Sequence, residues 1–187
     1  MENSVTRLAG LILRIIALVL ALILLALASA TIGLIRNNRS LIDKVTDVDT
    51  DDDDEVALSL LVVNTERTAY WLIILAVSVV IAEIVAIVVL LLNVQAHRLC
   101  RDIQQVIFSF IVAFFYLATG IACALYANAW AATPEECKTD EDFDCTEEAF
   151  TATNALQAVF CFAQMVVLGI IGSLTIYVII QRKNSSS

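Results

Sequence analysis

Four long apolar blocks, separated by shorter polar segments, run along the chain of 187 residues. They cover about residues 9–35, 70–92, 106–127 and 159–180. A hydrocarbon core ~30 Å thick needs about 20 helical residues at about 1.5 Å each, and every block is at least that long. The pattern therefore predicts an all-α integral membrane protein. We expect residues 1–187 to form a single domain, an antiparallel bundle of four transmembrane helices.

The distribution of charge predicts which way this bundle faces. Basic residues precede or enter the first block, follow the fourth and occupy the segment of about residues 93–105, whereas most acids lie in about residues 36–69 and 128–152. The segment 36–69 also carries four basic residues, but four spans force the loops to alternate, so it must share a side with the segment 128–152, which holds only Lys138. Lys and Arg are enriched in cytoplasmic loops. We therefore expect both termini and the middle loop to be cytoplasmic, and the two acidic loops to be outside. Trp71 and Trp130 stand at the outer ends of their spans, where indole rings favour the interface.

The composition supports membrane insertion of all four blocks. Hydrophobic residues make up 60% of the chain and the mean hydropathy is +0.85, whereas soluble proteins average ~45–50% apolar residues. The first block imitates a signal peptide, because small residues at positions 28–30 follow a basic and then an apolar stretch. Its apolar run after Arg14 is about 21 residues long, beyond the ~7–15 of a signal peptide, so we expect an uncleaved anchor.

Two ionisable residues fall inside the predicted spans. Glu83 stands in the middle of the second span, and Arg14 lies about one turn into the first. A charge at the bilayer centre costs about 3 kcal/mol on insertion scales, so such residues face other helices and have a partner. Arg14 is the candidate partner of Glu83. The alternatives are a protonated Glu83 bonded to another neighbour, and an Arg14 that reaches the inner headgroups or Asp102.

Small and polar residues follow one face of three spans. These residues are Gly10, Arg14, Ala17, Ala21, Leu24 and Ala28 in the first span, Ser109, Ala113, Tyr116, Gly120, Cys123 and Ala127 in the third, and Asn154, Gln157, Cys161 and Gln164 in the fourth. Gly169 and Ser173 add a pair of small residues four positions apart. Small residues let helices approach closely and polar ones bond across the interface, so these faces predict the bundle interior.

The five cysteines divide between loops and spans. Cys137 and Cys145 lie in the second acidic loop, where an oxidising compartment favours a disulfide between them, with two free thiols as the alternative. Cys123 and Cys161 lie inside spans, where cysteine usually packs as a small residue. Cys100 stands among basic residues at the inner membrane surface and is a candidate for S-palmitoylation.

Residue patterns typical of catalysis or cofactor binding are missing. The acidic run 47–55 begins like a calcium-binding EF-hand loop, but Asp52 stands where that loop needs Gly, and Leu58 where it needs Glu. His97 is the single histidine, without a cluster of other metal ligands in sequence, and no glycine-rich phosphate loop occurs. Basic clusters are too small for nucleic acid. We expect no enzymatic activity, cofactor, metal or nucleic-acid partner.

Several features occur together: short inner tails, four similar spans, paired cysteines in the third loop, and the segments 13–20 (LRIIALVL) and 114–118 (FFYLA). With these features almost the whole chain resembles four-span proteins of the MARVEL type, which include myelin-and-lymphocyte-like proteins and the Casparian-strip-like proteins of plants. Arg14 matches an arginine common in the first span of the Casparian-strip-like branch. That branch has an aspartate within the third span, whereas Asp102 precedes the span here. The resemblance implies roles in membrane apposition, vesicle trafficking or lateral scaffolding without catalysis.

We therefore expect a non-enzymatic membrane organiser or trafficking component that acts by self-association. Its partners would be the lipid bilayer and further copies or other membrane proteins, at the plasma membrane or on endomembrane vesicles. One alternative is a small transporter or channel subunit that uses Glu83 and Arg14. Another is a claudin-like junction or adhesion protein, although the first outer loop, residues 36–69, lacks the cysteine pair typical of claudins.

Overall fold

The structure, a computed structural model, describes residues 4–38, 53–92, 98–132 and 141–185. These four ranges form the helices α1 (Ser4–Asn37), α3 (Asp53–Leu91), α4 (Arg98–Ala131) and α5 (Glu141–Ser185). Each helix contains a segment long and apolar enough to cross a membrane: Leu8–Asn37, Ser59–Leu91, Asp102–Ala131 and Glu147–Gln181. Within the described ranges no strand occurs, which confirms the prediction of an all-helical fold with four apolar helices.

The helices extend beyond the apolar blocks seen in the sequence. α3 begins at Asp53, so residues 53–69 are helical although we assigned them to the first outer loop. α4 continues to Ala131, and α5 begins at Glu141. Both bounds lie inside the second outer loop predicted for about residues 128–152. Hydropathy marks only the apolar middle of a helix. Residues 53–69 contain no Gly or Pro, and acids at the helix start favour the positive end of the helix dipole, so the helix continues past the apolar block.

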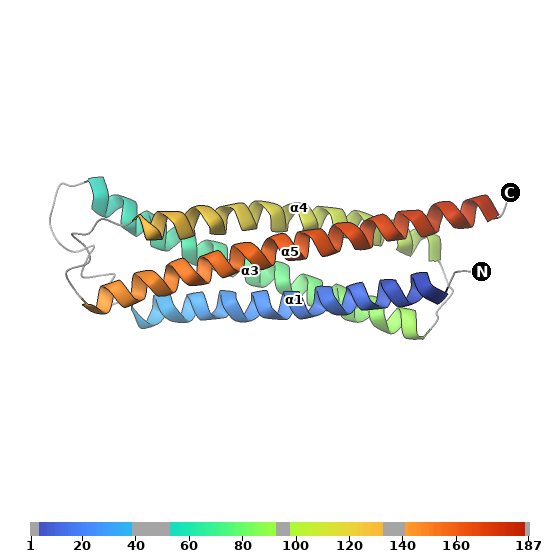
Figure 1. Cartoon of the computed structure of the whole chain (residues 1–187), viewed down its shortest axis with the longest axis horizontal. Coiled ribbons are helices and arrows are strands. Elements are labelled where there is room, and N and C mark those ends of the chain that lie inside the picture. Colours follow the sequence, from blue (N-terminus) through green and yellow to red (C-terminus); the bar gives the residue numbers. More distant parts are fainter. Residues whose placement is uncertain (1–3, 39–52, 93–97, 133–140, 186–187) are drawn as a thin grey trace.

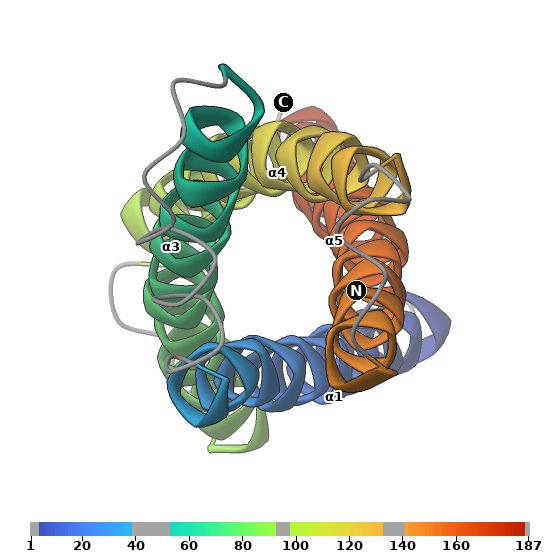
Figure 2. The same ribbon diagram turned by 90° about the vertical axis from the view of Figure 1, so that its left-hand side faces the viewer.

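The four helices form an antiparallel ring, seen from the side in Figure 1 and end-on in Figure 2. Both α1 and α4 pack against α3 and α5, so each helix has two neighbours in the ring. The start of α1 and the end of α5 lie at the same end of the bundle (Figure 1).

The interior of the ring is formed by the small-residue faces that the sequence predicted. On α1, Ala17, Ala21, Leu24 and Ala28 are fully buried, whereas Gly10 is half-buried. On α4 all six predicted residues, from Ser109 to Ala127, are buried. A heptad-spaced face stays on one side of a helix, and its small side chains let the neighbouring helices come close.

Two glycines set the approach of α4 to α5. A Cβ atom on Gly120 would lie 3.1 Å from the Cβ of Cys161, and one on Gly172 would lie 3.0 Å from the ring of Phe110. We expected Gly169 and Ser173 to provide a close step, and that prediction is wrong: Ser173 is exposed, and no atom lies within 4 Å of a Cβ on Gly169. Each follows a buried position of α5 by one residue, which turns it about 100° away from the interface.

Trp130 corrects a second expectation, because it is not at an exposed interface. It is only 2% exposed, stacks on Phe150 with ring centroids 4.7 Å apart, and donates from Nε1 to Oγ1 of Thr65 at 3.3 Å. A buried indole needs such a partner for its N–H group. Trp71 differs, since it is 43% exposed and makes a T-shaped contact with Phe115, with the ring centroids 5.8 Å apart.

Candidate functional site: polar side chains inside the bundle

Arg14 on α1 and Glu83 on α3 form an ion pair inside the bundle. Nη1 of Arg14 donates to Oε2 of Glu83 at 3.0 Å. Arg14 is 8% exposed and Glu83 is 3% exposed. The sequence left three arrangements open, and the structure has the direct pair. Arg14 lies slightly nearer the end of its apolar segment than Glu83 does, and the long side chain of arginine spans the difference.

This pair connects two antiparallel helices through charge. In a medium of low dielectric constant two opposite charges attract strongly, but removing both from water is costly, so the pair itself adds little net stability. Breaking it by removing one partner leaves a buried charge uncompensated, at about 3–5 kcal/mol. The ion pair therefore makes the packing of α1 on α3 depend on both residues being present.

A second polar group, Gln157 on α5, connects three helices. Its Nε2 donates to Oγ1 of Thr31 on α1 at 2.7 Å, and its Oε1 accepts from Sγ of Cys123 on α4 at 3.6 Å. The Thr31 hydroxyl donates in turn to the carbonyl oxygen of Leu27 at 3.1 Å. Both ends of the amide are thus satisfied. Gln157 was predicted to face inward, and it does so as a bridge between α1, α4 and α5.

Gln164 lies two turns beyond Gln157 on α5. Both Gln164 and Tyr116 of α4 are fully buried. Among the described residues neither amide atom of Gln164 has a hydrogen-bond partner, and neither does the hydroxyl of Tyr116. The contacts of Gly120 with Cys161 and of Gly172 with Phe110 set an antiparallel register that places Tyr116 and Gln164 at the same level. A buried polar group left unsatisfied costs about 1–3 kcal/mol, so these two side chains lower the stability of the folded bundle.

Three buried threonines belong to the polar interior although the sequence analysis missed them. One of them, Thr119, donates to the carbonyl oxygen of Phe115 at 2.8 Å. Thr31 continues the buried face of α1 three residues beyond Ala28, so the same heptad pattern, extended by one step, identifies it. Thr65 is 1% exposed, donates to the carbonyl oxygen of Leu61 at 2.8 Å and accepts from Trp130. It fell inside the predicted first loop, where no burial was expected.

The remaining predicted site residues have different outcomes. Asn154 is buried and donates from Nδ2 to the carbonyl oxygen of Phe150 at 2.9 Å. Cys123 and Cys161 are free, buried thiols, as expected for packing residues. Cys137 lies outside the described residues, and the side chains of Cys145 and Cys100 are outside the description too. The disulfide and the lipidation site thus stay predictions.

The sequence also raised the question of metal and cation binding. Among the described residues no three His, Cys, Asp or Glu side chains come together in a way that could hold a metal ion. The acidic run 47–55 has no described side chain.

Among the described residues the polar interior thus includes one ion pair, one three-helix amide bridge, the hydrogen bond between Trp130 and Thr65, and the unpartnered groups of Gln164 and Tyr116. The first three of these contacts join different helices. The function has to be argued from this geometry and from the outer surface of the ring. Comparison of the chain with protein-family models, curated proteins and solved structures finds no match in any of the three.

Proposed function

We propose that the protein crosses a membrane four times and organises that membrane by lateral self-association, without catalysis. The outward-facing side chains support insertion, because large apolar residues cover the ring on every helix. Leu22, Ile81, Phe114 and Val159 are examples, with between 48% and 66% of each side chain exposed. Soluble monomers rarely expose continuous apolar surfaces larger than a few hundred Å².

The proposed orientation has both termini in the cytoplasm. The end of the bundle where α1 starts also holds the start of α4, whose sequence includes Arg98 and Arg101. The end of α5, whose sequence includes Arg182 and Lys183, lies at the same end of the bundle. Positive residues favour the cytoplasmic side. The burial of Trp130 removes one of the two tryptophans from this argument, so the orientation now rests mainly on charge.

Self-association is supported by a surface of small residues on the outside of α1. Ala26, Ser29 and Ala30 are exposed, and no atom lies within 4 Å of a Cβ on Gly33. Ala26 and Ala30 are four residues apart, as are Ser29 and Gly33, so the four form one outward face. In lipid, faces of small residues let two helices approach closely, and this packing drives their association. This outer surface is the observation that carries the proposal, because the inward small residues are already used within the bundle.

The experiment compares Ala30→Leu with Ala118→Leu, a matched change at an exposed alanine on α4. Protein labelled with a single fluorophore is reconstituted in vesicles at a series of protein-to-lipid ratios, and oligomers are counted by stepwise photobleaching. We expect Ala30→Leu to weaken association about tenfold or more, which corresponds to about 1.4 kcal/mol. Ala118→Leu should leave it unchanged. Equal association of wild type and Ala30→Leu would contradict the proposed surface.

Within this proposal, the resemblance of the sequence to MARVEL-type proteins favours vesicle trafficking, membrane apposition or lateral scaffolding as the process served. A second candidate, a small transporter or channel subunit, is favoured by one observation: Gln164 and Tyr116 are buried without partners among the described residues. The two candidates differ in flux. Vesicles that contain the protein should show no pH-dependent flux if it is an organiser, whereas a flux abolished by Glu83→Gln would favour the transporter.

A further inference from the structure

Two exposed arginines stand on neighbouring helices without an acidic partner. Arg36 belongs to the last turn of α1, and Arg67 lies on α3. Within the described ranges neither forms an ion pair. Both come from the segment 36–69, where basic residues run against the charge asymmetry that orients the bundle. Their place at this end of the bundle therefore needs another reason than the orientation.

Tyr70 brings the two arginines together. Nη2 of Arg36 donates to the hydroxyl of Tyr70 at 3.4 Å, and Tyr70 follows Arg67 by three residues on α3. Residues three apart on a helix have Cβ atoms about 5–6 Å apart, and a tyrosine side chain points back over the preceding turn. The hydroxyl of Tyr70 therefore stands over the turn that carries Arg67, with Arg36 beside it. Among the described residues its O–H has no acceptor, so it can donate to a ligand.

This arginine patch, formed by Arg36, Arg67 and Tyr70, lies at the depth of lipid headgroups. The apolar block of α1 ends directly before Arg36, and that of α3 starts at Tyr70, both at the end of the bundle opposite the chain termini (Figure 1). Arg67 stands three residues, about 4.5 Å, outside the block. The headgroup layer adds about 5–7 Å to each side of the hydrocarbon core. Both guanidinium groups are therefore within reach of lipid phosphates.

The chemistry of the arginine patch selects a phosphate. Guanidinium groups present paired donors that match two oxygens of one phosphate, and the hydroxyl of Tyr70 adds a third group. Glu66, the acid next to Arg67, is half-buried and forms no ion pair among the described residues, so it lowers the positive charge of the patch without cancelling it.

An apolar stripe continues from Arg67 toward the middle of the membrane. Ile74 and Ile81 follow Arg67 at steps of seven residues, which keeps them on the same face of α3. They are 56% and 59% exposed. A lipid whose phosphate lies at Arg67 can therefore lay an acyl chain along this stripe.

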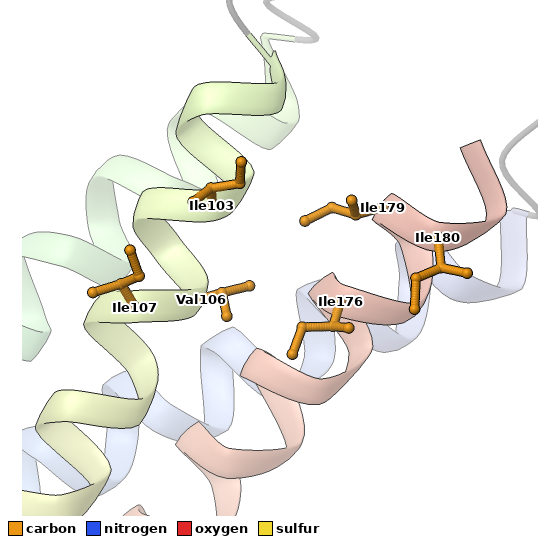
Figure 3. Close-up of a pocket in the computed structure, with 6 residues that line it drawn as sticks. All are labelled: Ile103, Val106, Ile107, Ile176, Ile179 and Ile180. Atoms are coloured by element: carbon orange, nitrogen blue, oxygen red, sulfur yellow. The ribbon is translucent and has the colours of Figure 1, made fainter. Parts of the chain in front are cut away.

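A groove at the opposite end of the bundle has a different chemistry. It lies between α4 and α5, has a volume of about 240 Å³, and is lined by Ile103, Val106, Ile107, Ile176, Ile179 and Ile180 (Figure 3). In Figure 3, Val106 from α4 and Ile179 from α5 point into the space between the two helices. The lining side chains offer no hydrogen-bond donor, so the groove fits any apolar chain and selects no headgroup.

We propose that the arginine patch binds the phosphate of one membrane phospholipid, with Arg36, Arg67 and Tyr70 as its donors. The proposal rests on the membrane insertion proposed above, and it adds a specific lipid site to it. Arg36 follows Ser29 by seven residues and so continues the face of the self-association surface, whereas Arg67 lies on α3. Replacing Arg67 therefore tests the lipid site separately from self-association.

The fluorescence of Trp71 reports on the site, because Trp71 lies four residues from Arg67 and is exposed, whereas Trp130 is buried. The full chain in maltoside micelles is titrated with phosphatidylcholine brominated on its acyl chains, or with a phosphate-free galactolipid that has the same brominated chains. Phosphatidylcholine has no net charge, so general charge attraction does not bias the comparison. We expect phosphatidylcholine to quench Trp71 at a lower mole fraction than the galactolipid does. Trp71→Phe gives the background from Trp130.

Three substitutions identify the groups that hold the phosphate. Arg67→Gln should raise the phosphatidylcholine mole fraction for half-quenching about fivefold and leave the galactolipid curve unchanged. Lys183→Gln is the control, because it removes an exposed positive charge at the opposite end of the bundle, and it should change neither curve. Glu66→Gln removes the neighbouring acid and should lower the mole fraction for half-quenching.

Three results would overturn the lipid site. Wild-type protein quenched equally by the two lipids has no preference for phosphate, and an unchanged phosphatidylcholine curve for Arg67→Gln means that the arginine does not bind it. Relief of the quenching by millimolar inorganic phosphate would show a site for free phosphate instead of a lipid. Resistance of the protein to alkaline extraction from vesicles reports insertion separately, so an inserted protein without this lipid preference refutes the lipid site alone.

Discussion

Gln157 on α5 and Thr31 on α1 share a hydrogen bond of 2.7 Å between residues 126 positions apart in the chain. The same amide accepts from Cys123 on α4, so one side chain ties three helices together. Replacing Gln157 with Leu removes both bonds and leaves the thiol of Cys123 without this acceptor. We expect a loss of about 0.6–2 kcal/mol, the usual worth of a polar contact between membrane helices.

The measurement for Gln157→Leu is the free energy of unfolding in mixed micelles titrated with denaturing detergent. Gln104→Leu serves as the control, because Gln104 is exposed on α4 and its replacement should change stability little. Equal stability of Gln157→Leu and wild type would show that the bridge contributes nothing.

The ion pair of Arg14 with Glu83 predicts a strongly non-additive pair of substitutions. Glu83→Leu leaves a buried guanidinium without its counter-ion, and we expect a loss of about 3–5 kcal/mol. The double substitution Arg14→Met with Glu83→Leu removes both charges, and its stability should return close to that of the wild type or exceed it. Unfolding free energies of the four proteins of the cycle test this. Additive losses would mean that the two charges do not interact.

Replacing Gln164 should change stability in the opposite direction to replacing Gln157, although both are buried glutamines on one face of α5. Its amide has no partner among the described residues, so Gln164→Leu removes an unsatisfied group and should be neutral or stabilising by up to about 1–3 kcal/mol. Tyr116→Phe should behave in the same way. A destabilised Gln164→Leu, measured by the same unfolding titration, would instead mean that the amide is bonded, for example to a buried water.

Two glycine-to-alanine substitutions should change the stability of the bundle in opposite directions. Gly169→Ala adds a methyl group where no atom lies within 4 Å, and it should stabilise α5 by up to about 1 kcal/mol because alanine has the higher helix propensity. Gly120→Ala places its methyl 3.1 Å from the Cβ of Cys161, so the helices must separate at a cost of about 1–3 kcal/mol. Thermal unfolding of both variants decides this, and stabilisation by Gly120→Ala would contradict the close contact of α4 with α5.

The sequence by itself determined the helices and much of their inward faces. Hydropathy over about 20 residues identifies a span, and a repeat of small and polar residues identifies the side that meets other helices. For that reason the predicted inward residues are buried: Ala17, Ala21, Leu24 and Ala28 on α1, the six predicted residues of α4, and Gln157 and Gln164 on α5. Such patterns are local, since a helix places residues three, four and seven positions apart on the same face wherever it lies.

Only the tertiary structure decided which faces meet and at what depth. It selected Glu83 as the partner of Arg14, placed Gly172 and not Gly169 against α4, and buried Trp130 against Phe150. It also joined Ile103 to Ile107 with Ile176 to Ile180 around one groove. Each outcome depends on the rotation and axial offset of one helix against another. A difference of one residue turns a side chain by about 100°, and no pattern within a single helix specifies that relation.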